Sequence, residues 1–465
     1  MMTDVPRAIP RPSERRRPLV DRGAVEPQVI DNAQKTSGWT SFATVGWVAG
    51  LSTAVLFGML GLSGREDSSL GIVLVPIVLV AAWVIIGRFV SEGHGASFGA
   101  LVFAGLGVRL LASVPRLIGG ADSPVYQREG VRIASSLRSL QFDVATGRSI
   151  PGTGAVRYFT GVVNVFTGST YIATFLVFAI LAFIGQVVFL LGVRSSLNTA
   201  QFRVLSIVVM FSPTLAFWPS SIGKESLALF GIGFGVFGAS RLYDRRWSGV
   251  GPVLLGFFAV GMVRPHVAMV LLAGLLIGLF ARRAHTRGRV ATHAALLVVV
   301  VVGSMWMAGA SADLFGLDSL EGISDVSAAL DFAQERTSQD EARFVAARVS
   351  SVADYPWAAV TVLFRPFPWE APNAFAMISA LESIFLALLL LRAVPGFVTH
   401  GRQLVQRGQL LYAVAFVLVF IFLFSAIGNF GILSRQRAQV IPFVLLIAAF
   451  GLGAERRGSF ARAKP

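Results

Sequence analysis

Five basic residues stand at the edges of long apolar runs, where membrane proteins rarely place charge: Lys224, Arg264, Arg365, Arg435 and Arg437. In the topology that the charge distribution predicts, these runs are helices that begin at the outer face of a membrane. Their first N–H groups and the positive ends of their dipoles point outward, so a cation there is unfavourable. A shared phosphate would resolve the conflict through charge-assisted hydrogen bonds. We therefore predict that four of the five, all but Arg365, bind a phosphate or diphosphate together with His266.

Two carboxylates in an early polar stretch could act as a general base. Asp122 follows two glycines after an apolar run, and Glu129 lies seven residues further on. Transfer to a hydroxyl group needs a carboxylate that takes the proton while cations stabilise the departing phosphate. We expect Asp122 to be this base, and Glu129 to be the second candidate or a partner of Arg132. The alternative is that Asp122 caps a helix that begins near Pro124.

The cations also have structural interpretations that the sequence leaves open. Arg435 and Arg437 could extend from a helix end to lipid headgroups. Lys224 could pair with a loop carboxylate, and Arg264 could stand at an ordinary helix start before Pro265.

Further polar residues fall into two groups. Glu370 could hydrogen-bond a sugar, and Trp369 and Tyr126 could stack on sugar rings, although aromatic residues are also common in the interfacial belts of membrane proteins. Arg109 and Glu382 are the base and the acid placed deep inside predicted spans, and we expect them to pair with each other.

The composition identifies the class of protein that carries these residues. The chain has 465 residues, of which 54% are hydrophobic and 14% are charged, whereas soluble domains carry about a quarter charged residues. A soluble enzyme is therefore excluded. Runs of about 20 apolar residues match helices that cross roughly 30 Å of hydrocarbon. We predict an all-α, polytopic transmembrane bundle of about twelve spans, at residues 42–63, 70–90, 97–115, 169–193, 203–219, 223–242, 248–263, 265–281, 290–308, 373–392, 409–430 and 437–453.

The distribution of basic residues orients this bundle. Every short loop on the side that holds both termini is basic, which makes that side cytoplasmic. The net charge of +15 is then mostly a topology and headgroup signal, and we expect no nucleic-acid partner. The high Gly, Ala and Val content and the Arg-rich tail are typical of bacteria, so we place the protein in a bacterial cytoplasmic membrane.

The predicted organisation is a disordered basic cytoplasmic tail (1–41), a transmembrane domain (42–453) and a second cytoplasmic tail (454–465). Two long loops, 116–168 and 309–372, lie outside, and we expect helices at the membrane interface in both. Prolines in the second loop favour a short re-entrant or interfacial helix over a further span.

Several cofactors have no support in the sequence. The chain holds no Cys, which excludes disulfides and thiolate ligands. It has no P-loop and no dinucleotide fingerprint, and no cytoplasmic loop is long enough for a nucleotide-binding domain. Its five His residues form no H-E-x-x-H motif. We expect no metal and no other cofactor.

The sequence resembles the bacterial integral-membrane glycan-assembly proteins, namely the polyprenyl-dependent GT-C glycosyltransferases and the O-antigen or exopolysaccharide polymerases. The resemblance covers about residues 97–453 and is carried by the stretches GGADSPVYQREG, FWPSSIGKES, VRPH, LFRPFPWE and NFGILSRQRAQVIP. It implies transfer of a sugar or oligosaccharide from a polyprenyl-phosphate-linked donor to a glycan acceptor at the outer leaflet, without a nucleotide sugar or ATP. On this hypothesis Asp122 is the general base, and Arg365 and Glu370 line the acceptor cleft.

Two other classes of function remain open. Twelve spans with both ends inside are also common in transporters, so the chain could be a transporter or flippase for a lipid-linked or anionic solute. A transporter is expected to show two related halves and broken helices near the midplane. A non-catalytic scaffold of an envelope assembly is the third possibility.

Overall fold

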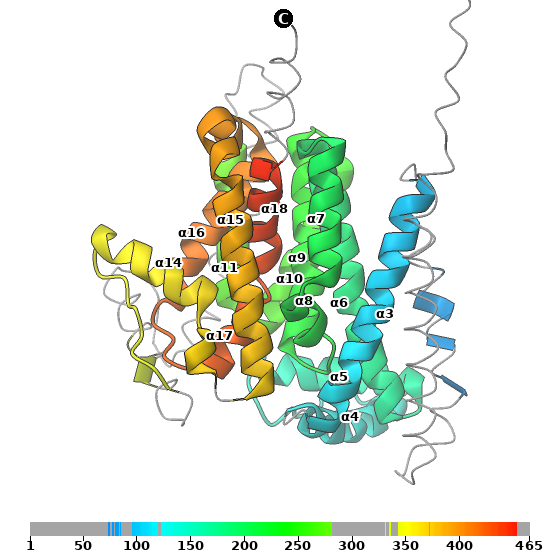
Figure 1. Cartoon of the computed structure of the whole chain (residues 1–465). Helices are drawn as coiled ribbons and strands as arrows, with labels where there is room; N and C mark the ends of the chain where they lie inside the picture. The colour runs from blue at the N-terminus through cyan, green and yellow to red at the C-terminus, as the bar shows by residue number, and fades with distance from the viewer. Residues whose placement is uncertain are drawn as a thin grey trace, which may run out of the picture.

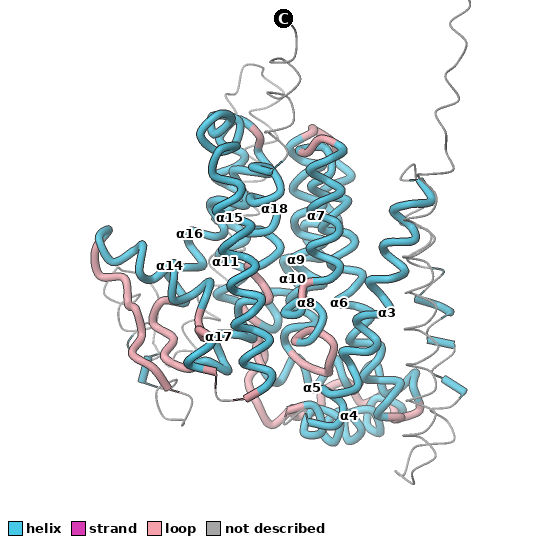
Figure 2. The backbone as a smooth tube through the Cα atoms, viewed as in Figure 1, coloured by secondary structure: helices cyan, strands magenta, loops and turns pink. Residues whose placement is uncertain are grey.

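The computed structural model describes residues 95–119, 122–280, 343–371 and 373–452, with a few further residues between 73 and 84 and between 331 and 335. Within these ranges the chain is almost entirely helical and contains no strand (Figure 2). The predicted all-α class is therefore confirmed. Both predicted tails, the predicted spans 42–63 and 290–308 and most of 70–90 lie outside the described residues.

The helices follow one another along the chain as Figure 1 labels them. They are α3 (Gly95–Gly119), α4 (Ser123–Arg138), α5 (Thr153–Thr167), α6 (Tyr171–Val193), α7 (Thr199–Phe211), α8 (Pro213–Phe217), α9 (Lys224–Tyr243), α10 (Val250–Val263), α11 (Pro265–Phe280), α14 (Tyr355–Phe364), α15 (Ala374–Gln406), α16 (Gly408–Phe424), α17 (Phe430–Arg437) and α18 (Ile441–Leu452). Four short 3-10 turns accompany them: η1 (Arg194–Ser196), η2 (Trp247–Gly249), η3 (Val352–Asp354) and η4 (Pro368–Glu370).

Four described helices, α3, α6, α9 and α15, are long and apolar enough to cross a membrane. A fifth span results if α17 and α18, which meet at an angle of 58°, count as one bent helix. The helices α7, α10, α11, α14 and α16 are shorter and also apolar. These helices support a multi-pass membrane protein.

The helices form two groups that stand side by side (Figure 1). One group contains α3, α6, α7, α9 and α10, and the other contains α11 and α14 to α18. In the first group α6 and α9 approach closely because Gly185 faces Gly233, where a Cβ atom would overlap the facing backbone. Apolar residues on both sides of the seam belong to one buried core.

The first long loop forms a helical hairpin at one end of the bundle. Helices α4 and α5 pack against each other through Ile133 and Gly161. Several hydrogen bonds tie the hairpin to the bundle: Ser123 Oγ donates to the carbonyl of Ile222 at 3.2 Å, the Gly152 N–H donates to the carbonyl of Met262 at 2.8 Å, and Thr174 of α6 donates to Asn164 Oδ1 of α5 at 2.8 Å. The hairpin therefore covers the ends of the bundle helices.

Of the second long loop, the structure describes residues 343–371 and a few residues between 331 and 335. Its helix α14 has 10 residues and is about 15 Å long, half of what a span needs. The interfacial or re-entrant placement of this helix stays a prediction.

The predicted span 203–219 is in fact two helices, and this break changes the expected role of two charges. Pro213 has no N–H, so the carbonyl of Val209 loses its helical donor. Arg109 donates to this carbonyl at 3.0 Å and to that of Met210 at 2.7 Å. On the other side of the break, Glu382 accepts from the Thr214 N–H at 2.9 Å. The expectation that Arg109 and Glu382 pair with each other is therefore wrong, because each satisfies backbone groups that the break exposes.

Candidate functional site

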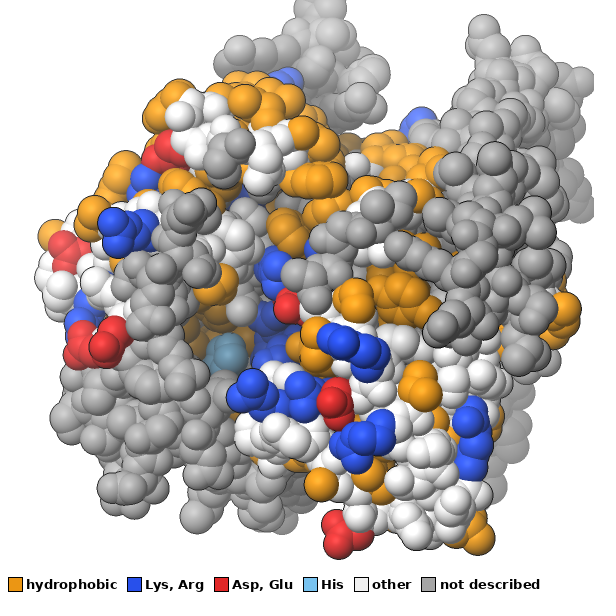
Figure 3. Space-filling view, turned by 90° about the horizontal axis from the view of Figure 1, so that it is seen from below, with side chains coloured by type: hydrophobic (Ala, Val, Ile, Leu, Met, Phe, Trp, Pro, Cys, Tyr) orange, Lys and Arg blue, Asp and Glu red, His pale blue; other side chains and the backbone are white. Residues whose placement is uncertain are grey.

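Charged side chains from several helices meet at the end of the bundle that the α4–α5 hairpin covers. We call this group the charge cluster, and it consists of Arg116, Asp122, Lys224, Glu225, Arg264 and Arg435. Each member interacts electrostatically with others of the group. Figure 3 looks onto this end and shows Lys and Arg side chains gathered in and around a central hollow, with acidic side chains between them.

Asp122 and Arg435 form an ion pair that connects the start of α4 with α17. The Arg435 Nη1 donates to Asp122 Oδ2 at 2.8 Å. Asp122 occupies the N-cap position of α4, but its side chain makes no capping hydrogen bond. The alternative that Asp122 serves as a capping side chain is therefore wrong. With 56% of its side chain exposed, the carboxylate stays accessible to another molecule.

Glu225 and Arg264 form the buried ion pair of the cluster. Glu225 lies in the first turn of α9, and Arg264 lies between the end of α10 and the start of α11. The Arg264 Nη2 donates to Glu225 Oε1 at 2.6 Å, and the two side chains are 4% and 13% exposed. The Nε and Nη1 atoms of Arg264 are also buried, and no described residue accepts a hydrogen bond from them. Buried donors without partners are costly, so this guanidinium is suited to bind an additional anion.

Lys224 adds a second cation to this buried pair. It is the first residue of α9, as the sequence predicts, and its charge interacts with Arg264, Glu225 and Asp122. The positive end of the α9 dipole reinforces the field of the ammonium group. An anion at this point would therefore contact both a helix start and two cations.

Arg116 and Arg435 share one aromatic ring. Their guanidinium carbons lie 5.3 and 5.5 Å from the ring centroid of Trp218, and Arg116 Nη2 also donates to Ser221 Oγ at 3.0 Å. Sequence reasoning missed Arg116 because it lies in the last turn of α3, where the helix dipole favours a cation. The signal that could have found it is its place on the predicted outer side, against the positive-inside rule.

Arg435 and Arg437 lie at the end of a helix and not at the helix start that the sequence predicts. The sequence places them at the start of the last span, but both lie in the last turn of α17, where a cation is favourable. The reason is that the helix is interrupted: α17 ends at Arg437 and α18 begins at Ile441. Lys224, the first residue of α9, is still a cation at a helix start, where the helix dipole disfavours positive charge.

Tyr126 and His266 border the charge cluster. Burial, and then the charges of Glu225 and Asp122, raise the pKa of Tyr126 to about 12. Its hydroxyl group therefore stays protonated at neutral pH and can donate a hydrogen bond. The His266 ring interacts with the charges of Arg264 and Lys224 and lies 5.9 Å, centroid to centroid, from Phe424.

The cluster carries an excess of positive charge. Four of its six residues are cations and two are carboxylates, which leaves two positive charges uncompensated. Two negative charges are what a diphosphate diester brings, so the cluster matches such a group in charge.

Glu129 lies apart from the cluster, on an exposed part of α4. It pairs with Arg132 at 3.2 Å, so the predicted partnership of these two residues is confirmed. Glu129 is not among the charges that act most strongly on Arg116, Lys224, Glu225 or Arg264.

Arg365, Trp369 and Glu370 form a second polar group after α14. The Arg365 Nε donates to both carboxylate oxygens of Glu370 at 3.1 Å, and the Phe367 N–H donates to Glu370 at 2.9 Å. Burial raises the pKa of Glu370, but these hydrogen bonds outweigh it and lower the pKa below its usual value. Trp369 stacks on Phe367 and is 81% exposed.

Arg437 is buried beside this second group. Its Nη1 donates to the carbonyls of Leu363 and Arg365 at 2.9 and 3.0 Å and to Ser383 Oγ at 2.9 Å, and its Nη2 donates to Ser379 Oγ. These bonds tie α17 to α14 and α15. Both Nη groups of Arg437 are thus occupied by the protein itself, whereas Nη1 of Arg264 has no acceptor among the described residues.

No group of three or more His, Cys, Asp or Glu residues that could hold a metal ion occurs in the described ranges. Comparison of the chain with protein-family models, with curated proteins and with solved structures finds no match. The chemistry of the charge cluster is therefore the feature of the molecule that points to a function.

Proposed function

We propose that this protein transfers a sugar or oligosaccharide from a polyprenyl-phosphate-linked donor to a glycan acceptor at the outer face of a bacterial cytoplasmic membrane. It would act in the synthesis of a cell-envelope polysaccharide. The proposal includes a chain of about twelve spans with both termini in the cytoplasm, of which the described helices form a part.

One observation supports the proposal most strongly: the buried Arg264 has two donor atoms without partners among the described residues, and it belongs to the same cluster as Lys224, whose charge interacts with both Arg264 and the accessible Asp122. This arrangement combines a phosphate-binding group with a base. A transferase that uses a lipid-linked donor needs both within reach of one substrate.

The proposed reaction assigns a role to each part of the cluster. Asp122 takes the proton of the acceptor hydroxyl group, whose oxygen attacks the anomeric carbon of the donor. The bond between this carbon and the phosphate oxygen breaks, and its electron pair leaves with the phosphate. Lys224, Arg264 and Arg435 stabilise the leaving group, and Arg435 also orients Asp122 through Oδ2.

The same geometry favours transfer over transport. The charge cluster gathers residues at helix ends: Arg116 in the last turn of α3, Lys224 in the first turn of α9 and Arg264 at the end of α10. A transporter is expected to hold its solute at broken helices near mid-length, whereas at the break between α7 and α8 the charged groups of Arg109 and Glu382 bond the backbone itself.

The test compares two carboxylate variants in a transfer assay with purified protein in vesicles, using a lipid-linked glycan donor from the bacterial envelope. Asp122→Asn removes the proposed base and is expected to lower the transfer rate by about 10³-fold, with no loss of folded protein. Glu129→Gln is the matched control and is expected to retain activity, because Glu129 lies outside the cluster. Full activity of Asp122→Asn would reject the assignment of the base.

A further inference from the structure

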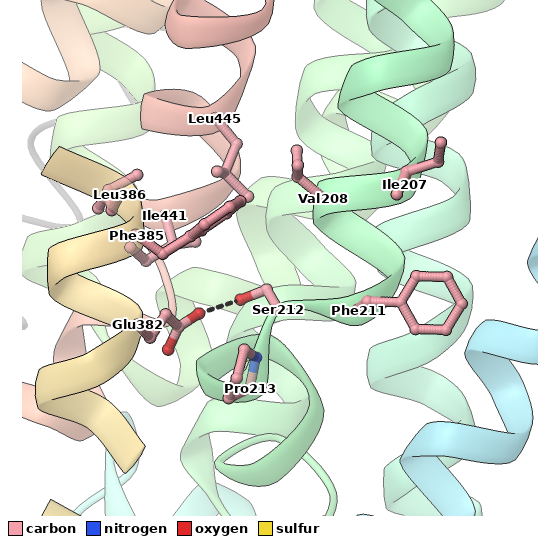
Figure 4. Close-up of a pocket in the computed structure, with 10 residues that line it drawn as sticks. All are labelled: Ile207, Val208, Phe211, Ser212, Pro213, Glu382, Phe385, Leu386, Ile441 and Leu445. Carbon is pink, nitrogen blue, oxygen red and sulfur yellow. Dashed lines mark hydrogen bonds between the residues drawn. The ribbon is translucent and has the colours of Figure 1, made fainter. Parts of the chain in front are cut away.

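A cavity of about 310 Å³ lies in the seam between α7, α15 and α18. Its walls are apolar except at Ser212 and Glu382. The other lining residues are Ile207, Val208, Phe211, Pro213, Phe385, Leu386, Ile441 and Leu445. Figure 4 shows that Glu382, Ser212 and Pro213 lie together at one end of this space and that Leu445 lies toward the other. The cavity is therefore amphipathic, with one polar and one apolar end.

The carboxylate at the polar end is engaged with the protein. Glu382 accepts hydrogen bonds from Ser212 Oγ at 2.5 Å and from the Thr214 N–H at 2.9 Å. Its charge is thus compensated by the start of α8. The rest of the cavity offers only hydrocarbon contacts to an occupant.

Two segments of the chain lead from the cavity to the charge cluster. Helix α8 starts at Pro213 in the cavity wall and is followed by Trp218, the ring that Arg116 and Arg435 share. Its five residues span about 7.5 Å. The second segment runs from Arg435 in α17 to Ile441 in the cavity wall. The cavity and the cluster are thus neighbours along two separate paths.

The surface between them is apolar and aromatic. Phe217 of α8 stacks on Phe375 of α15 with ring centroids 4.9 Å apart. Arg116 lies 5.3 Å from the same Phe217 ring. A hydrocarbon chain that leaves a phosphate at the cluster would meet these rings first.

The cavity is bordered by a helix face that suits contact with lipid. In the most apolar 18-residue stretch of α15, only 22% is buried inside the protein. Phe385, which lines the cavity, is 52% exposed, and Leu388, which does not, is 60% exposed. Such an apolar exposed face on a candidate span is expected to contact acyl chains.

We propose that this cavity binds the first part of the hydrocarbon chain of a lipid whose phosphate group is held by the charge cluster. The proposal rests on the proposed function, in which that lipid is the donor. An engineered cavity of about 150 Å³ holds one benzene ring, so the volume here accommodates about a dozen carbon atoms. The remainder of the chain stays in the bilayer.

The experiment places a photoreactive benzoylphenylalanine at Phe385 in the full-length protein in vesicles. The probe is a tritium-labelled polyprenyl phosphate, and the matched control carries the same amino acid at Leu388. We expect about tenfold more labelling at position 385 than at 388, because the chain would be held in the cavity for longer than in bulk lipid. Excess unlabelled polyprenyl phosphate should compete, whereas the same excess of phosphatidylglycerol should not.

A second variant tests whether one lipid occupies both places. Adding Arg435→Ala to the position-385 protein should lower the labelling about tenfold, because a charge-assisted contact to the phosphate is lost. Equal labelling at 385 and 388, labelling that Arg435→Ala leaves unchanged, or competition by phosphatidylglycerol would each overturn the inference. Unchanged labelling would mean that the cavity holds the chain without the phosphate being bound at the charge cluster, and competition by phosphatidylglycerol would mean that the cavity holds an ordinary membrane lipid.

The labelling requires no turnover, so its failure can be distinguished from the failure of the proposed function. Transfer activity without selective labelling rejects the cavity assignment and leaves the transferase intact. Selective labelling in a protein that shows no transfer supports a lipid-phosphate site and rejects the transferase.

Discussion

Arg435 and Arg437 are two residues apart in α17, and they belong to sites of different character. Arg437 is 2% exposed, and both of its Nη groups donate to backbone carbonyls and serine hydroxyls of α14 and α15. Arg435 is half-exposed and contacts one accessible carboxylate and one aromatic ring. Two residues correspond to about 200° around a helix, so the side chains point to nearly opposite sides.

Arginines that stabilise the fold thus differ from arginines that can bind a ligand. Arg109 resembles Arg437, because both donate to carbonyls that helix breaks or ends leave without a helical partner. Arg264 is equally buried, but one Nη group serves Glu225 while its Nε and Nη1 have no acceptor among the described residues. The number of donors that the protein itself occupies is therefore more informative than burial.

The largest expected effect is on stability at Arg437. Arg437→Met removes four hydrogen bonds and takes the donor away from the buried carbonyls of Leu363 and Arg365 and from two serine hydroxyls, which we expect to lower the free energy of unfolding by about 4 kcal/mol. Arg435→Met breaks an exposed pair and should cost less than about 1 kcal/mol. Thermal denaturation of the purified variants in detergent measures both. Equal losses would mean that the two arginines do not differ in role.

The next effect is on lipid binding at the buried ion pair. Arg264→Met should weaken the binding of a polyprenyl diphosphate about a hundredfold, because two charge-assisted hydrogen bonds are lost. Glu225→Gln should not weaken binding, since it removes a negative charge near the phosphate and keeps an acceptor for Arg264. Equilibrium binding to the detergent-solubilised protein measures both. If both variants lose affinity equally, the pair is structural.

A smaller effect is expected at the ring that two cations share. Trp218→Leu removes both cation–π contacts and should weaken binding of the same lipid about tenfold. Trp369→Leu is the control, because this ring is exposed and lies on Phe367. The same binding measurement on both variants checks this, and an equal loss at Trp369 would contradict the placement of the lipid phosphate.

The smallest effect is on the pH dependence of stability. Hydrogen bonds from Arg365 and Phe367 lower the pKa of Glu370. Its stabilising contribution is therefore complete above the unfolded pKa near 4.3 and is lost as the pH falls through the lower folded pKa. Melting temperatures of the native protein and of Glu370→Gln should differ at pH 7 and converge in acid. A difference that stays constant with pH would contradict this linkage.

The fold was predictable where apolar runs are long and unbroken. The predicted spans 169–193 and 223–242 correspond closely to α6 and α9, because a run of this length has no other stable arrangement in a bilayer. Pro213 marks the break between α7 and α8 in the sequence, but the predicted span 203–219 runs through it. The break before Ile441 is marked by Pro442 in the first turn of α18, where a proline is tolerated although it interrupts a longer helix, and it changed which end of a helix holds Arg435.

The candidate site was predictable in part. Charge in an unexpected place was enough to select Lys224, Arg264, Arg435 and Asp122, which the fold brings together. It was not enough to separate Arg437 from them, because the carbonyls and hydroxyls that occupy its donors come from α14 and α15, far away in the sequence. Such partners depend on tertiary packing, which no local pattern reports.

The most direct test of the central claim is an experimental structure of the protein with a polyprenyl diphosphate bound. We expect a phosphate oxygen at hydrogen-bond distance, about 2.8 Å, from Nε or Nη1 of Arg264, with Lys224 in contact with the same group. A phosphate bound elsewhere, with Arg264 still making only its bond to Glu225, would contradict it.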